Sequence, residues 1–282
     1  MLKRTITAVV AIAIFIPVCV FSKYLIVWQG AMTVLSVMAA YEMTKCVGAS
    51  KHVSLLIPAY AVSLLAPMLV LHVSDLFLWV FALYVGYMIW TFAADVFSRG
   101  KIDFEVSAAS FMGVFYTSSA FMCLTLLRGF GSYRYLLVFI GPWVSDTFAY
   151  LTGRAIGRHK LIPEVSPKKT VEGAVGGVVF AAFAYALYGW IVLRFFPAEA
   201  RQVMSGNKVS LLVMALAGAV VAVISQIGDL AMSVVKRRYG VKDYGWIFPG
   251  HGGVLDRFDS VLMTAPVLMV LSQIPAVSAY LV

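Results

Sequence analysis

The chain has 282 residues, of which 62% are apolar and only 12% are charged. This composition excludes an ordinary soluble domain, because so few charged residues could not cover a water-exposed surface of that size. The formal net charge is +9. Such a charge is compatible with nucleic acid, anionic lipid or a phosphate-bearing substrate as partner, so the positions of the basic residues must decide among them.

Nine apolar runs, each about long enough to cross a bilayer, follow one another along the chain. Because the runs lack strand-like alternation and their backbone groups must be satisfied within lipid, we expect helices. The predicted fold is all-α, a single polytopic membrane domain over residues 1–282, with N-terminal helices in 1–130 and the chemistry in 131–282. The predicted spans are 5–22, 24–44, 53–73, 76–94, 107–127, 134–153, 173–193, 209–232 and 260–281.

The basic residues predict an orientation for these spans. If the N-terminus is cytoplasmic, most of the 22 Lys and Arg residues fall on the cytoplasmic side, as the positive-inside rule requires. Segments 154–172 and 233–259 then lie in the cytoplasm and the C-terminus lies outside. Both segments are rich in Lys and Arg, so we expect a site on the cytoplasmic face of the inner membrane.

The end of the eighth run carries polar residues at helical spacing. Ser225, Asp229, Ser233 and Lys236 fall at i, i+4, i+8 and i+11, so they line one stripe of a helix. An isolated carboxylate at this depth is costly, so we expect Asp229 to face a cavity, a cation or a basic partner. A structural ion pair with Lys236 or Arg237 is the alternative.

The next segment, 242–260, reads K-D-Y-G-W-I-F-P-G-H-G-G-V-L-D-R-F-D-S. Its glycines, among them Gly252 and Gly253, allow backbone N–H groups to approach an anion, as a phosphate-binding loop requires.

Two acids follow at the expected start of the last helix. Asp256 and Asp259 are three residues apart, so both carboxylates can share a helix face and coordinate Mg²⁺. Arg257 lies between them and can clamp a phosphate. The alternative for this short pattern is a capping acid and an arginine that reaches the interface.

The segment 166–173 reads S-P-K-K-T-V-E-G and predicts a turn that begins at its proline and leads into a glycine-rich helix. Lys168 and Lys169 suit a triphosphate or a lipid phosphate, and a basic anchor beside the membrane is the alternative. The spacing of Gly173 and Gly177 predicts close helix packing.

Three other acids occur in apolar runs. Asp146 in the sixth run is a second buried acid of the C-terminal half. Glu42 and Asp95 lie near the ends of the second and fourth runs, so we expect them to reach the membrane interface.

From Ser233 to Asp259 the chain reads S-x-x-K-R-x4-K-D-x-G-x3-P-G-H-G-G-x-x-D-R-x-D. This long ordered pattern resembles the signature of CDP-diacylglycerol synthases, also called phosphatidate cytidylyltransferases. The S-P-K-K-T-x-E-G and D-T-x-A-Y-x-x-G-R segments are similar to that family as well. The resemblance implies transfer of a cytidylyl group from CTP to phosphatidate in phospholipid biosynthesis, giving CDP-diacylglycerol and pyrophosphate. It also implies Mg²⁺ as cofactor, with a second cation left open.

The resemblance also suggests roles for individual residues. Cation binding falls to Asp229, Asp256 and Asp259, with Asp146 as a fourth acid. Phosphate binding falls to Lys236, Arg237 and Arg257, with Lys168 and Lys169 at the triphosphate or headgroup. Further positions on the binding side are Ser225, Ser233, Lys242, Asp243, His251, Gly252 and Gly253, of which His251 and the glycines are expected to shape the loop.

Two other functions were weighed. An ion-coupled transporter would also use buried acids, but the polar groups of this chain concentrate on one side, whereas a carrier binds at the midplane. A CTP-dependent polyprenol kinase fits the phosphatidate-type pattern less well. We expect CTP, phosphatidate and membrane lipids as partners and no nucleic acid, and a homodimer is left open.

Overall fold

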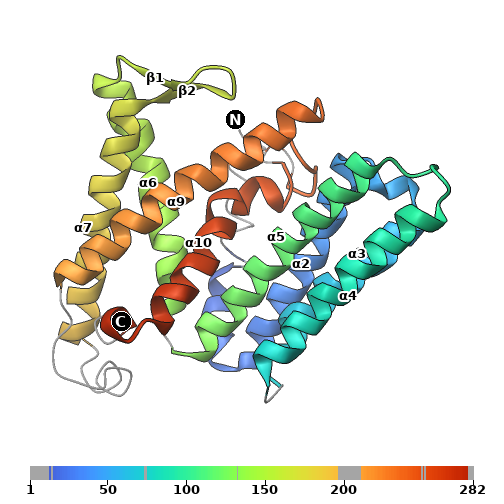
Figure 1. Ribbon diagram of the computed structural model, residues 1–282. Coiled ribbons are helices and arrows are strands. Elements are labelled where there is room, and N and C mark those ends of the chain that lie inside the picture. Colours follow the sequence, from blue (N-terminus) through green and yellow to red (C-terminus); the bar gives the residue numbers. More distant parts are fainter. Residues whose placement is uncertain are drawn as a thin grey trace. The chain divides into compact units, whose positions relative to one another are not determined.

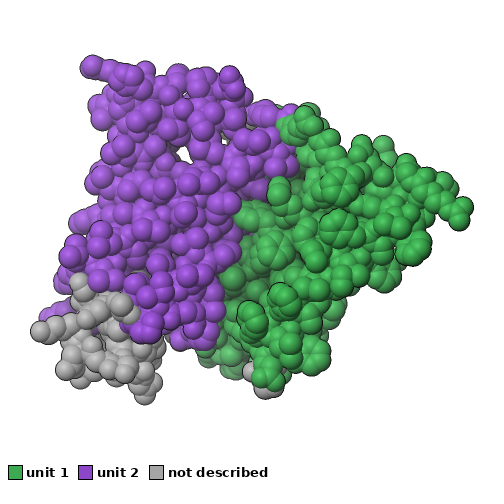
Figure 2. Space-filling view, viewed as in Figure 1, with its two compact units in different colours: residues 1–129, 238–258 green, residues 130–237, 259–282 purple. Residues whose placement is uncertain are grey.

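The computed structural model describes residues 13, 15–72, 75–131, 133–195, 211–248, 250 and 252–278. This part of the chain is helical except for its loops and one short hairpin of two strands (Figure 1). The chain forms two compact units, unit 1 with residues 1–129 and 238–258 and unit 2 with residues 130–237 and 259–282 (Figure 2).

Unit 1 is built on four long helices. They are α2 (Leu25–Cys46), α3 (Val53–Leu69), α4 (Leu76–Phe97) and α5 (Phe104–Gly129), with short 3₁₀ turns η1 (Phe21–Lys23) and η2 (Ala49–Lys51). Helices α2, α3 and α5 pack on one another. Small residues such as Ala40 and Ala59 allow this close approach, and both are fully buried in the shared core.

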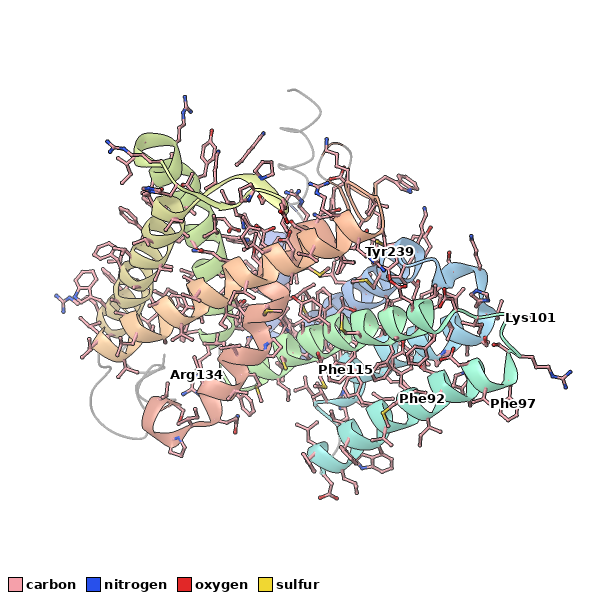
Figure 3. The ribbon with its side chains drawn as sticks, turned by 45° about the horizontal axis from the view of Figure 1, so that its top comes forward. Phe92, Phe97, Lys101, Phe115, Arg134 and Tyr239 are labelled. Carbon is pink, nitrogen blue, oxygen red and sulfur yellow. The ribbon has the colours of Figure 1, made fainter. Side chains whose placement is uncertain are left out.

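Helix α4 presents most of its surface outward. Only Tyr87 and Thr91 of its residues are buried. Phe92 and Phe97, both visible in Figure 3, are 54% and 82% exposed. An apolar helix with exposed aromatic side chains matches a surface that faces lipid rather than water.

Unit 2 contains the hairpin and the remaining helices. They are α6 (Arg134–Ile156), β1 (Lys160–Ile162), β2 (Ser166–Thr170), α7 (Val171–Phe195), α9 (Leu211–Arg238), α10 (Leu255–Gln273) and α11 (Pro275–Ser278). Helix α10 begins in unit 1 and continues into unit 2. The antiparallel hairpin connects α6 to α7, which pack along each other (Figure 1).

Glycines bring α6 and α7 together, as the sequence predicts. A side chain at Gly177 would meet the Ser145 carbonyl oxygen of α6 at 2.7 Å, and one at Gly173 would meet the Ala149 carbonyl oxygen at 2.6 Å. Both contacts are with backbone atoms, which cannot move aside cheaply. The helices can therefore adopt this spacing only because both positions lack a side chain.

The all-α polytopic fold is confirmed. Eight of the predicted spans overlap helices α2 to α7, α9 and α10, while half of the first, 5–22, lies outside the described residues. Within the described part, α2, α4, α5, α7 and α9 are long and apolar enough to cross a membrane. The chain is thus a multi-pass membrane protein.

One local expectation was wrong. Residues 166–170 form a strand rather than a turn, and Lys160 pairs with Thr170 while Ile162 pairs with Ser166. Pro167 is compatible with this strand because its fixed φ angle allows an extended backbone and a two-stranded sheet consists of edges, where a missing N–H is tolerated.

Candidate functional site

Unit 2 contains a cavity of about 400 Å³, within the size range of small-molecule sites. Its walls come from α6, both strands of the hairpin, the start of α7 and the middle of α9. Five charged side chains line it, namely Asp146, Arg154, Lys168, Lys169 and Asp229. Basic and acidic side chains therefore line the same cavity, which suits a ligand that carries phosphate groups together with a metal ion.

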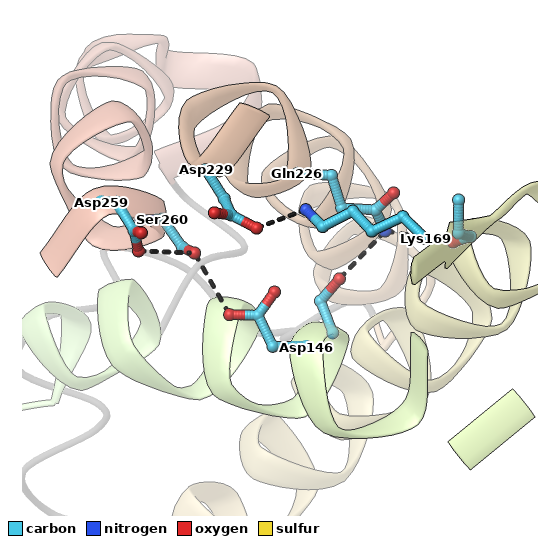
Figure 4. Close-up of polar contacts among 8 residues, drawn as sticks. Asp146, Lys169, Gln226, Asp229, Asp259 and Ser260 are labelled. Carbon is cyan, nitrogen blue, oxygen red and sulfur yellow. Dashed lines mark hydrogen bonds and ion pairs between the residues drawn. The ribbon is translucent and has the colours of Figure 1, made fainter. Parts of the chain in front are cut away.

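The central contact of this cavity is an ion pair between Lys169 of β2 and Asp229 of α9 (Figure 4). The two side chains are 29% and 24% exposed, so neither is sealed from the cavity. This confirms the expectation that Asp229 faces a cavity and a basic partner. The partner is on the hairpin, 60 residues earlier in the sequence.

Two further acids of unit 2 lie close to Ser260 (Figure 4). The Ser260 hydroxyl is 3.1 Å from Asp146 Oδ2 and 3.4 Å from Asp259 Oδ1, and the backbone N–H of Ser260 donates to Asp259 at 2.8 Å. A hydroxyl has one proton, so it donates to one carboxylate at a time. Ser260 therefore links an acid of α6 to an acid of α10.

The acids Asp146, Asp229 and Asp259 come from three different helices and act on one another electrostatically. Lys169 offsets this repulsion at Asp146 and Lys236 offsets it at Asp259. The three carboxylates are thus close enough to interact, and a bound cation would reduce their repulsion further.

The oxygen donors of this cluster fit Mg²⁺, which prefers carboxylates and other oxygen ligands. As the side chains stand, however, no three His, Cys, Asp or Glu residues in the described ranges are grouped closely enough to hold a metal ion. The Lys169 ammonium group lies against Asp229, where a cation would bind. The donor set therefore suits a divalent cation once Lys169 has moved away.

Gln226 ties the three helices around the cavity together. Its amide nitrogen donates to Ser145 Oγ of α6 and to the Ala174 carbonyl oxygen of α7, both at 3.1 Å. Ser225, the next residue back on α9, is fully buried and its hydroxyl makes no hydrogen bond to the described part of the chain. Ser225 therefore lies behind the cavity wall rather than on it.

The base of the hairpin is held by Glu172 in the first turn of α7. Its carboxylate accepts from the backbone N–H of Arg158 at 3.1 Å and of His159 at 3.3 Å, and pairs with His159 Nδ1 at 2.6 Å. The same end of the hairpin has a second anchor, since Lys169 directly precedes Thr170, the partner of Lys160, and is paired with Asp229. This arrangement sets the position of the two lysines over the cavity.

Unit 1 contains the glycine-rich loop, which joins α9 to α10, and Asp256 in the first turn of α10 braces it. Asp256 is 8% exposed, and its Oδ2 accepts from the backbone N–H of Tyr244 at 2.8 Å and of Gly253 at 3.0 Å. Gly252 has a φ angle of +86°, a conformation that side chains disfavour. Asp256 therefore joins two residues of the loop, Tyr244 and Gly253, to the first turn of α10.

A second carboxylate on this loop was not foreseen. Glu42 was expected at the membrane interface, but it is 1% exposed, and its two oxygens accept from the backbone N–H of Val254 and Leu255, each at 2.9 Å. The expectation was wrong because Glu42 faces the start of α10 rather than the end of its own helix. Asp95, the other acid assigned to the interface, is half-buried and accepts from Ser107 at 2.7 Å.

Two carboxylates of the same chain, those of Glu42 and Asp256, thus accept hydrogen bonds from the end of the loop. Gly253 is one of the glycines expected to let backbone N–H groups approach a phosphate. Its N–H donates to Asp256, and those of Val254 and Leu255 donate to Glu42. As the loop stands, these donors brace its fold and are not open to an external anion.

The sequence matches a family model described as the cytidylyltransferase family over residues 2–274. The chain belongs to this family. Named phosphatidate cytidylyltransferases that are similar to it include those of Staphylococcus haemolyticus, 32% identical over 275 residues, and Staphylococcus aureus (strain COL), 34% identical over 272 residues. Each alignment covers 95% of this chain and 97% of the relative. The family predicted from the signature is confirmed, and the protein is an enzyme of that family.

The candidate residues of this cytidylyltransferase fall into one group in each unit. Unit 2 brings together Asp146, Lys168, Lys169 and Asp229 around the cavity, with Asp259 beside Ser260. Ser233 and Lys236 are half-buried and Arg237 is exposed farther along α9. In unit 1, Lys242, Asp243 and Arg257 are exposed, Gly252, Gly253 and Asp256 are buried, and His251 lies outside the described residues.

Sequence reasoning gave no role to Glu42, Glu172, Gln226 or Ser260. Glu172 lies inside a segment that resembles the family, so its place in that motif was the available signal. Ser260 lies directly after the signature, which ends at Asp259. Glu42 is an acid in an apolar run, and such acids carry a functional expectation by default.

Proposed function

We propose that this enzyme transfers the cytidylyl group of CTP to phosphatidate, giving CDP-diacylglycerol and pyrophosphate. The observation that carries the proposal is the charged cavity of unit 2, where two lysines and an arginine face acidic side chains. The relatives named phosphatidate cytidylyltransferases, aligned over 95% of the chain, support this choice of substrate.

The reaction joins two anions, so charge is its main obstacle. An oxygen of the phosphatidate phosphate attacks the α-phosphorus of CTP, a new P–O bond forms, and the bond from the α-phosphorus to the bridging oxygen of the β-phosphate breaks. Pyrophosphate leaves with the electron pair. The nucleophile needs little deprotonation near neutral pH, since the second pKa of a phosphate is about 6. The protein therefore has to align the groups and neutralise charge rather than supply a strong base.

The residues of unit 2 suit these two tasks. Lys168 and Lys169 would bind the triphosphate or the lipid phosphate. Asp146, Asp229 and Asp259 would hold Mg²⁺, which when bound neutralises the phosphates and the departing pyrophosphate. Ser260 would keep Asp146 in place through its hydroxyl and Asp259 through its backbone N–H.

Further roles are proposed along the chain from α9 into α10. Lys236, Arg237 and Arg257 would bind phosphate groups, and Asp256 would be a cation ligand in addition to bracing the loop. Lys242 and Asp243 are exposed and would contact substrate from the loop.

The lipid substrate also constrains the site. Phosphatidate keeps its phosphate at the membrane interface, whereas CTP arrives from water, so the cavity must be reachable from both. Tyr150, which lines the cavity, is 65% exposed, and Asp229 is not sealed in apolar packing. We place this opening at the cytoplasmic face of the inner membrane, because segments 154–172 and 233–259 are rich in basic residues.

The proposal is tested with purified protein in lipid nanodiscs. Pyrophosphate should appear only when CTP, phosphatidate and Mg²⁺ are all present, and CDP-diacylglycerol should appear in equal amount. Omission of phosphatidate controls for simple hydrolysis of CTP. Pyrophosphate release that does not depend on phosphatidate would contradict the proposed substrate.

A further inference from the structure

Glu42 is a buried acid in the half of the chain that carries none of the signature. It lies on α2, and 212 residues separate it from Val254, whose backbone N–H it accepts at 2.9 Å. Its other oxygen accepts from Leu255 at the same distance. Both carboxylate oxygens are therefore engaged by the backbone at the start of α10.

The chemistry of this contact is specific to a carboxylate. The first N–H groups of a helix have no partner within it and lie at the positive end of the helix dipole. A buried carboxylate is costly unless hydrogen bonds compensate for the lost water. Glu42 meets both requirements at once, because one side chain satisfies two N–H groups and places negative charge at the helix start.

Two glycines of the loop leave the space that Glu42 occupies. A side chain at Gly245 would meet Glu42 Cδ at 2.8 Å, and one at Gly253 would overlap the carboxylate group. Glu42 is therefore enclosed by the two ends of the loop as well as by the helix start. The position of Glu42 and the positions of Gly245 and Gly253 therefore constrain each other.

The first turn of α10 carries Asp256, the next residue after Leu255. Asp256 accepts from Gly253 and Tyr244 while Glu42 accepts from Val254 and Leu255, so the two carboxylates hold consecutive N–H groups. Any movement of Glu42 would move the turn from which Asp256 and Arg257 project. Glu42 itself is 1% exposed, so it does not contact substrate.

We propose that Glu42 is a positioning residue that tethers the glycine-rich loop and the first turn of α10 to α2 and so fixes Asp256 and Arg257 for the reaction. The consequence for the reaction rests on the proposed function, whereas the tether itself does not. Loss of Glu42 should leave the helices folded and lower kcat, because the reacting groups would be less well aligned.

The tether is tested without substrate by a spin label in the loop. Trp246, 77% exposed, is replaced by Cys and labelled with a nitroxide, in a chain whose three native cysteines are replaced. Glu42→Gln should increase the mobility of the label, because an amide offers one acceptor where two are needed. Asp95→Asn is the control, since it neutralises another acid of unit 1 that does not contact the loop, and it should leave the spectrum unchanged. Unchanged mobility in Glu42→Gln would overturn the tether.

The kinetic arm separates positioning from binding and from folding. Glu42→Gln and Glu42→Ala should reduce kcat by about tenfold or more, with the KM for CTP close to that of the wild type. The unfolding temperature should fall, because buried N–H groups lose their acceptor, but both variants should still unfold in one transition above the assay temperature. A change confined to KM would overturn the positioning role. Suppose that Glu42→Gln mobilises the loop but the wild-type chain makes no CDP-diacylglycerol. That result would overturn the proposed function and leave the tether standing.

Gly245→Ala in the wild-type chain covers the case in which Glu42 variants fold poorly, and a double-mutant cycle with Glu42→Ala tests whether the two residues are coupled. Gly245→Ala places a methyl group against the Glu42 carboxylate, so it should reduce kcat by about tenfold in the wild-type chain. In the Glu42→Ala background the space is open, and the same change should cost less than about twofold. Equal losses in both backgrounds would show that the two residues are not coupled and would overturn the proposal.

Discussion

Lys169 of β2 and Asp229 of α9 form an ion pair across the cavity of unit 2. In this pair each charge has a partner of opposite sign. An entering triphosphate would give Lys169 an alternative partner with more negative charge, and Asp229 would then be available to a cation. If Asp229 binds a cation as proposed, the ion pair would be exchanged for that cation when the triphosphate enters.

Asp229→Asn should lower kcat by about a hundredfold or more, comparable to the loss of a principal electrostatic element in other enzymes. The unfolding temperature should change little, because a partly exposed ion pair contributes about 0–1 kcal/mol. Steady-state kinetics and thermal unfolding in the same detergent check both statements. Lys51→Ala, an exposed change in η2, is the control and should be mild. Near-normal turnover of Asp229→Asn at limiting Mg²⁺ would refute the cation role.

Asp256→Asn separates two roles of one carboxylate. The variant should lose about two orders of magnitude in turnover, and the Mg²⁺ concentration needed for half-maximal rate should rise if Asp256 binds the cation as proposed. A Mg²⁺ titration of the variant and the wild type measures this directly. A lower rate with an unchanged Mg²⁺ dependence would leave Asp256 as a loop brace only.

Gly177→Ala should destabilise unit 2, because the new methyl group would meet the Ser145 carbonyl oxygen and the Gln226 amide. Overpacking of this kind costs about 1–3 kcal/mol, which thermal unfolding can detect. Gly86→Ala is the matched control, since Gly86 is also helical but has no atom within 4 Å of the new methyl group. It should be neutral or slightly stabilising, and equal effects of the two changes would contradict the packing argument.

Membrane orientation can be tested by cysteine labelling in intact cells. Single cysteines at Lys168 and Lys242 should resist a membrane-impermeant reagent until the cells are opened, because both positions are predicted to be cytoplasmic. Both residues are exposed in the structure, so protection cannot come from burial. Labelling from outside would reverse the proposed orientation.

The helices were largely predictable because the bilayer imposes one strong rule, a run of apolar residues of sufficient length. The ends of the helices were less predictable. Helix α9, for example, continues past its apolar run to Arg238, because polar residues that face water can also form a helix. The hairpin was missed because its five-residue strand β2 contains a proline and two lysines, which give no strand-like pattern.

The cavity acids were predictable for a different reason, the high cost of carboxylates in apolar runs. Their partners were not, because the contact of Asp229 with Lys169 and that of Glu42 with Leu255 depend on helix packing. The glycine-rich loop shows this limit clearly. Its composition is compatible with a phosphate cradle, and only the packing of α2 reveals that a carboxylate of the same chain already occupies the donors.

The proposed cytidylyl transfer is tested most directly by following the α-phosphate and the γ-phosphate of CTP in parallel reactions. CTP labelled at the α-phosphate, or separately at the γ-phosphate, is incubated with the purified enzyme, Mg²⁺ and phosphatidate. Cytidylyl transfer predicts that the α-label enters the lipid while the γ-label leaves as pyrophosphate. Appearance of the γ-label in the lipid would indicate a kinase instead, and no lipid labelling from either position would contradict the proposed function.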